Sequence, residues 1–151
     1  MYEILNHTAD LAIKVQSNTV KGLFYKCAIA LTDLLFGSQY LFRHTPYALR
    51  IMPLFSIQQK AGKITLQITA NNKEDLLVEF LGELLFHSIC KYRYFFDFKW
   101  KKFTEQEIIV DCLFHNLKAI DLKMDIKAVT YHNIKIKKDN NNFSVIITFD
   151  L

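Results

Sequence analysis

This sequence has little glycine and proline: four glycines and two prolines among 151 residues, and each glycine stands alone. Neither a G-x-G-x-x-G turn nor a G-x-x-x-x-G-K-[ST] loop can be drawn, which excludes the common phosphate-binding loops. The three cysteines, Cys27, Cys90 and Cys112, form no C-x-x-C pair. Zinc sites and disulfide frameworks therefore have no support, and we expect reduced cysteines that fill a core.

The chain also lacks long apolar runs. No stretch reaches the roughly 20 uninterrupted apolar residues that a membrane-spanning helix needs. Lys26 and Asp33 interrupt one apolar region, and Glu79 and Glu83 interrupt the other. The first ten residues, MYEILNHTAD, lack the basic region of a secretory signal peptide. We therefore expect a cytoplasmic protein with no membrane contact.

The composition is that of a folded protein. It is 51% hydrophobic and 23% charged, which argues against disorder and suits one domain covering residues 1–151. The net charge of +4 is mildly basic. Such a charge would help an encounter with RNA or an acidic partner, but many ordinary surfaces are as basic. Composition alone therefore identifies no partner.

Hydrophobic periodicity predicts two helices among several strands. Apolar residues recur at helical spacing in residues 17–37 and 71–95. Alternation of apolar and polar residues predicts strands at residues 10–17, 48–60, 64–70, 95–103, 107–114, 128–138 and 143–151. This order predicts an α+β two-layer sandwich, with two helices packed on one face of a mostly antiparallel sheet of about six to seven strands.

Polar residues mark the expected helix ends. Ser17 or Asn18 can cap the start of the first helix, and Gly37 can end it. The second helix has capping-box spacing at its start, in either Asn71–Glu74 or Asn72–Asp75. Capping residues therefore support both helices that the apolar periodicity predicts.

Three clusters are candidates for function. The segment NHTAD, residues 6–10, places polar side chains before the first strand, a pattern also typical of an ordinary turn. The segment MDIKAVTYHN, residues 124–133, holds Lys127 between two apolar residues. Lys127 either extends to solvent from an edge strand or lies beside a carboxylate or phosphate.

The third cluster, KYRYFFDFKWKKF at residues 91–103, interleaves basic and aromatic side chains. Single-stranded RNA surfaces combine such side chains, because bases stack on rings while cations meet phosphates. However, Phe96, Phe98 and Trp100 share one parity and would face the core of an amphipathic strand. The structural explanation is the simpler one, and the RNA-binding module remains the alternative.

Taken together, HTAD near the start, IKAVTYH before the end and a terminal IITFDL resemble the archease family. The resemblance covers nearly the whole chain, and IKAVTYH is its most specific segment. Archeases are non-catalytic cofactor proteins of the RtcB-type RNA ligase, which acts in tRNA splicing and RNA repair. The resemblance implies a protein that promotes guanylylation of that ligase by GTP, supports multiple turnover and meets RNA only through the ligase. It implies no contact with DNA.

The resemblance also implies a metal site. The family joins the aspartate of HTAD to its last two residues, which correspond here to Asp10, Asp150 and Leu151, the last through a main-chain or terminal oxygen. Carboxylates gathered in one place repel unless a cation lies between them or their pKa values rise. Oxygen ligands favour calcium, with magnesium or manganese as alternatives.

Other motif positions are candidates for contact with the partner. Lys127 is the foremost, since a cation could hold the carboxylates or meet a phosphate of the partner's nucleotide. The remaining candidates are His7, Thr130, Tyr131 and His132.

The sequence departs from the family pattern at three places. Asp125 stands where a glutamate is usual, Phe143 replaces a frequent tryptophan, and residues 114–123 lack an acidic, proline-bearing loop.

A third hypothesis is a metal-dependent hydrolase built on Asp10 and Asp150. It lacks an evident nucleophile, so we expect a protein that is not an enzyme.

Overall fold

The structure is a computed structural model that describes residues 2–6, 10–37 and 60–151. It has two helices and eight strands in these ranges. In chain order they are β1 (Tyr2–Asn6), β2 (Leu11–Ser17), α1 (Val20–Phe36), β3 (Gly62–Thr69), α2 (Lys73–Lys91), β4 (Arg93–Phe103), β5 (Glu107–Asn116), β6 (Ala128–Val129), β7 (Lys137–Asp139) and β8 (Asn142–Asp150). The predicted α+β class is confirmed.

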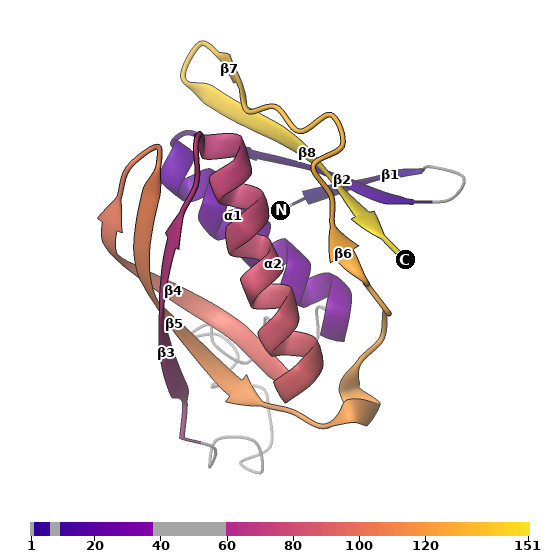
Figure 1. Cartoon of the computed structure of the whole chain (residues 1–151). Coiled ribbons are helices and arrows are strands. Elements are labelled where there is room, and N and C mark those ends of the chain that lie inside the picture. Colours follow the sequence, from indigo (N-terminus) through magenta and orange to yellow (C-terminus); the bar gives the residue numbers. More distant parts are fainter. Residues whose placement is uncertain (1, 7–9, 38–59) are drawn as a thin grey trace, which may run out of the picture.

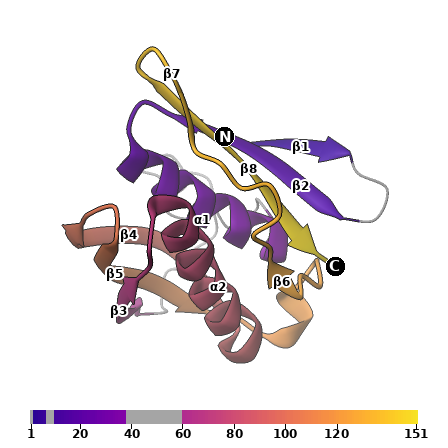
Figure 2. The ribbon, with the colours of Figure 1, turned by 45° about the horizontal axis from the view of Figure 1, so that its top comes forward.

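The strands form two antiparallel sheets. One has the order β1-β2-β8-β6, with β7 also paired to β8, and the other has the order β3-β5-β4. The helices lie between the two sheets, as Figures 1 and 2 show. We expected one sheet with slightly fewer strands. Apolar alternation reveals which face of a strand is buried, but it does not reveal which strand lies beside it.

Helix α1 shows why two sheets are needed. Its second half, residues 30–36, is buried at every position, because α1 contacts β2 of one sheet and β4 of the other. A helix that is covered on two sides has no room for a solvated polar face, and most of its positions become apolar. The run ALTDLLF reflects this burial, and its two polar side chains are hydrogen-bonded: Thr32 donates to the Ala28 main-chain oxygen, and Asp33 accepts from the Tyr2 hydroxyl.

Two of the four helix ends agree with the sequence, and α2 ends at Lys91 rather than near residue 95. The α1 cap is Thr19, whose side chain accepts a 2.9 Å hydrogen bond from the Gly22 amide, rather than Ser17 or Asn18. Gly37 ends α1 with φ of 91°, a left-handed conformation that glycine adopts without steric cost. Asn72 caps α2 by accepting a 2.8 Å hydrogen bond from the Asp75 amide. One of the two proposed capping pairs is thus correct.

Two expectations about strands change. The predicted strand at 128–138 divides into β6 and β7, with Asn133 at φ of 51° between them. Strand β1 was not predicted, and the expected strand at 48–60 lies outside the described residues apart from Lys60, which is in no strand.

The aromatic residues of β4 belong mainly to the core. Phe95 and Phe98 are buried, and Trp100 packs against Phe24 and Phe80 at centroid distances of 6.5 and 5.5 Å. Because these rings are packed inside, they do not form the stacking surface of the alternative RNA-binding hypothesis. No helix within the described part of the chain has the length and apolar character that a membrane crossing requires.

Replacing Phe24 by Ala should lower the free energy of unfolding by about 3–5 kcal/mol. Phe24 is fully buried and packs against Phe80 and Phe103, so its removal leaves a cavity. Phe86→Ala is the matched control, because Phe86 lies on α2 and is 55% exposed. Urea unfolding of both variants checks the expectation. Equal losses in the two variants would contradict this description of the core.

Candidate functional site

The pairing of β2 with β8 brings residues from the two ends of the sequence together. The register runs antiparallel from Ser17 opposite Phe143 to Leu11 opposite Phe149. Asp10 directly precedes Leu11, and Asp150 directly follows Phe149, so one further step of this register would set the two aspartates opposite each other. Side chains directly opposite in an antiparallel pair share one face of the sheet. Both aspartates are exposed.

Strand β6 adds Lys127 on the other side of β8. Ala128 pairs with Asp150, and the Lys127 amide donates a 2.8 Å hydrogen bond to the Asp150 main-chain oxygen. The Lys127 Nζ donates a 3.0 Å hydrogen bond to the main-chain oxygen of Leu151. Lys127 therefore does not simply extend into solvent, because its ammonium group lies at the end of the last strand.

The other candidate residues make contacts elsewhere in the structure. The Thr130 amide donates a 3.0 Å hydrogen bond to Thr148 of β8, which continues the pairing of β6. The Tyr131 hydroxyl donates to Glu79 of α2, away from the chain end. His132 is exposed, and its Nε2 lies 3.0 Å from the side-chain nitrogen of its neighbour Asn133. His7 lies outside the described residues.

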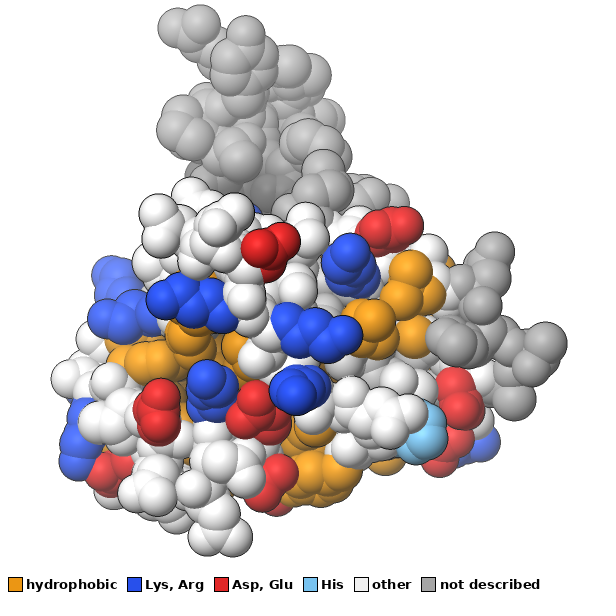
Figure 3. Space-filling model, turned by 90° about the horizontal axis from the view of Figure 1, so that it is seen from above, with side chains coloured by type: hydrophobic (Ala, Val, Ile, Leu, Met, Phe, Trp, Pro, Cys, Tyr) orange, Lys and Arg blue, Asp and Glu red, His pale blue; other side chains and the backbone are white. Residues whose placement is uncertain are grey.

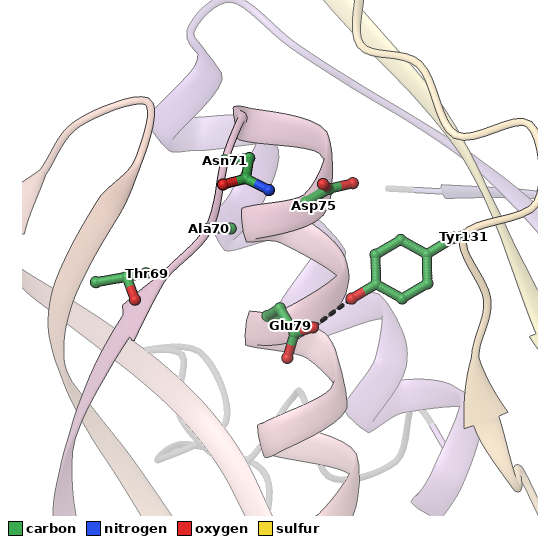
Figure 4. A pocket seen from close by; sticks show the side chains of 6 residues that line it. All are labelled: Thr69, Ala70, Asn71, Asp75, Glu79 and Tyr131. Carbon is green, nitrogen blue, oxygen red and sulfur yellow. Dashed lines mark hydrogen bonds between the residues drawn. The ribbon is translucent and has the colours of Figure 1, made fainter.

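The Tyr131 side chain borders a polar depression of about 430 Å³ (Figure 4). Its lining comes from the end of β3, the start of α2 and the segment after β6, and consists of Thr69, Ala70, Asn71, Asp75, Glu79 and Tyr131. Sequence reasoning missed Glu79 as a partner of Tyr131. An exposed glutamate on an amphipathic helix gives no signal of a contact 52 positions away.

The face beside the candidate site is mixed in character. Figure 3 views the molecule from above, and it shows lysine or arginine and acidic side chains around exposed hydrophobic ones. The exposed hydrophobic residues of this sheet include Ile4 on β1 and Ile146 on β8, which are 51% and 42% exposed. Exposed apolar side chains with charged neighbours are common in surfaces that contact other proteins.

The oxygen atoms of Asp10, Asp150 and Leu151 are of the kind that bind a hard cation. Carboxylate and main-chain oxygens are the ligands that calcium and magnesium take in proteins. Among residues 2–6, 10–37 and 60–151, no three His, Cys, Asp or Glu side chains gather as a metal-binding group. The expected ligand set has two carboxylates and one Leu151 oxygen, so its composition, and the backbone proximity of its members, fit an ion whose shell is completed from outside the chain.

These features define a class of small α+β proteins, in which two helices lie between antiparallel sheets and the last strand carries an aspartate beside a lysine. A family model described as the Archease protein family (MTH1598/TM1083) matches residues 2–151. The chain belongs to the archease family.

Similar proteins agree with this assignment. The protein archease of Thermoplasma volcanium is 28% identical over 99% of this chain and 98% of its own. An archease-like protein of Drosophila melanogaster is 26% identical over 99% of this chain and 90% of its own. The solution structure of Methanobacterium thermoautotrophicum protein 1598 has a TM-score of 0.70 at 17% identity, over 99% of this chain and 98% of that one.

A second solved structure has the same fold. The crystal structure of an archease from Thermotoga maritima, described as a possible chaperone, has a TM-score of 0.59 at 17% identity. The match covers 100% of this chain and 98% of that one.

The Tyr131 hydroxyl should ionise at a higher pH than an ordinary tyrosine. The hydrogen bond to Glu79, together with burial and the charges of Glu79 and Asp75, raises the pKa of Tyr131 to about 12 from its ordinary value of 10. The raised pKa means that the contact contributes stability in full below about pH 10 and loses it as the pH rises toward 12. NMR titration of labelled tyrosine should show this pKa falling in Glu79→Ala. A Tyr131 pKa that is unchanged by the substitution would exclude the contact.

Proposed function

We propose that this protein activates an RtcB-type RNA ligase in tRNA splicing and RNA repair, by promoting guanylylation of the ligase by GTP and repeated turnover. Membership of the archease family supports the proposal. The single observation that supports it is the antiparallel register of β2 with β8, which ends at Leu11 opposite Phe149, next to Asp10 and Asp150, while the Lys127 Nζ donates to the Leu151 main-chain oxygen. The protein would act in the cytoplasm as one domain and meet RNA only through the ligase.

The paired aspartates are the reason to propose a metal ion. Like charges directly opposite in a sheet destabilise it, whereas a divalent cation between two carboxylates stabilises both. The ion would be held by Asp10, Asp150 and a Leu151 oxygen, with calcium favoured over magnesium or manganese. Since calcium takes 6–8 oxygen ligands, a bound ion would offer open coordination positions to oxygen atoms of water or of the ligase.

The protein's own contribution is to hold and orient these groups. Strand β8 lies between β2 and β6, so main-chain pairing supports Phe149 from both sides of its strand and Asp150 from the side of β6. Lys127 keeps its ammonium group at the Leu151 oxygen, where it can balance negative charge or reach a phosphate of the partner's nucleotide. Thr130, His132 and His7 are weaker candidates for contact with the ligase.

The description of one relative agrees with action on a partner protein. The Thermotoga maritima archease is described as a possible chaperone, a role that acts on another protein. The mixed charged and apolar face in Figure 3 is a suitable surface for such a contact. The identity of the partner is our proposal.

Asp10→Asn and Asp150→Asn should each reduce stimulation of ligase guanylylation by about tenfold or more, because each removes one carboxylate from the proposed site. The measurement is a guanylylation time course with the ligase limiting, in the presence and absence of this protein. Asp139→Asn is the matched control, since Asp139 is also exposed and lies on β7.

Normal stimulation by either site variant over many turnovers would show that the site is wrongly assigned. A parallel filter-binding titration of the protein with bare RNA tests the alternative function. Tight, steeply salt-dependent binding without ligase would favour the RNA-binding module over the activator.

The Asp150→Asn substitution should have opposite effects on stability with and without calcium. In chelator, Asp150→Asn should leave the protein as stable or up to about 1 kcal/mol more stable, because it removes a like-charge pair. Calcium at about 100 times its dissociation constant should stabilise the unmodified protein by about 2.7 kcal/mol and the variant by much less. Thermal unfolding in the two buffers measures both effects. Equal calcium stabilisation of both proteins would exclude Asp150 as a ligand.

A further inference from the structure

The segment between β6 and β7 is held by helix α2 at two points. Near its start, the Tyr131 hydroxyl donates to Oε1 of Glu79, as the dashed line in Figure 4 shows. Near its end, the Ile136 amide donates a 3.1 Å hydrogen bond to Oε1 of Glu74. Both acceptors are carboxylates of the first half of α2. One helix thus binds both ends of the excursion that interrupts the predicted strand.

Strand β6 has few bonds of its own to keep it in place. Only Ala128 and Val129 pair with β8, and the Lys127 and Thr130 amides supply the flanking hydrogen bonds to Asp150 and Thr148. So short an edge strand is not stable by itself. Ile126 and Val129 are buried and fix which face of β6 points inward. Apolar burial is non-directional, however, and it does not fix the position of β6 along the helix.

The contact between Tyr131 and Glu79 supplies that missing constraint. Tyr131 lies two residues after Val129, and its ring extends from the segment toward α2 in Figure 4. Its hydroxyl bonds to a carboxylate, and charge-assisted hydrogen bonds are directional and stronger than neutral ones. At Asn133, φ of 51° begins the return of the chain toward Ile136 and the second bond.

We propose that Glu79 and Tyr131 are positioning residues, through which α2 holds β6 against β8 and so keeps the Lys127 ammonium at the Leu151 oxygen. Neither residue touches that oxygen itself. Loss of the contact would let β6 separate from β8 while the helices and the remaining sheet stay folded. The consequence for the ligase rests on the proposed function, whereas the hold on β6 is independent of it.

Amide hydrogen exchange measured by NMR tests the hold directly. Tyr131→Phe and Glu79→Ala should each speed exchange of the Lys127 and Thr130 amides by about two- to tenfold, the effect expected from losing one hydrogen bond. The double variant should add little to either single change, because both remove the same contact. Amides in the pairing of β3 with β5 should exchange as before.

Glu83→Ala is the matched control, because Glu83 is an exposed glutamate one turn further along α2. It should leave exchange of both amides unchanged. Glu79→Gln should restore slow exchange in part, since its amide oxygen can still accept from Tyr131. Unchanged exchange in Tyr131→Phe, or equal acceleration in Glu83→Ala, would overturn the proposal.

The link to function is measured with the same variants in the guanylylation time course. Stimulation should be lower in Tyr131→Phe and Glu79→Ala than in the unmodified protein, and it should stay normal in Glu83→Ala. Faster exchange with full stimulation would overturn the positioning role. If the unmodified protein stimulates no ligase, the proposed function fails instead, and the exchange data still decide whether α2 holds β6.

Discussion

The antiparallel pairing of β2 with β8 is the constraint on which the rest of this structure depends. It joins β2, near the start of the sequence, to β8, near its end. Without it, nothing would bring Asp10 near Asp150, and β8 with its partners β6 and β7 would not be joined to β1 and β2. The same sheet also covers α1 from the side opposite β4. One long-range pairing therefore completes both the core and the candidate site, and such pairing is costly to form because its partners are distant in the chain.

Local signals in the sequence predicted the local structure well. Gly37 ends α1 and Asn72 caps α2, because both positions depend on chemistry within a few residues. The partition into two sheets was not predictable in the same way. Whether β8 pairs with β2 or with β5 leaves the apolar alternation of every strand unchanged. The one hint was α1 itself, whose second half is mostly apolar around its circumference and therefore favours a covering layer on two faces.

The candidate site was likewise predictable from the sequence only in part. Asp10, Asp150, Leu151 and Lys127 were selected by resemblance to a family, and the strand register brings their backbones together, while the metal ion itself stays a prediction. His7 lies outside the described residues, and the assignment of residues 1–151 to one domain also stays a prediction. The contact of Tyr131 with Glu79 had no counterpart in the sequence, since it joins a loop to a helix across the fold. Motifs name the residues at a site, but they do not name those that hold the motif in place.

The charges of Asp10 and Asp150 explain why both Lys127 and a bound cation are reasonable beside them. In the described part of the chain, the ion pairs that form involve Asp111 and Glu107 rather than Asp10 or Asp150. The Lys127 ammonium group donates to the Leu151 main-chain oxygen, so it lowers the local negative charge without forming an ion pair with either aspartate side chain. Two facing carboxylates near one ammonium group leave a net negative charge, which a further cation can balance. Such a balance of charge attracts a divalent ion or a positively charged group of a partner.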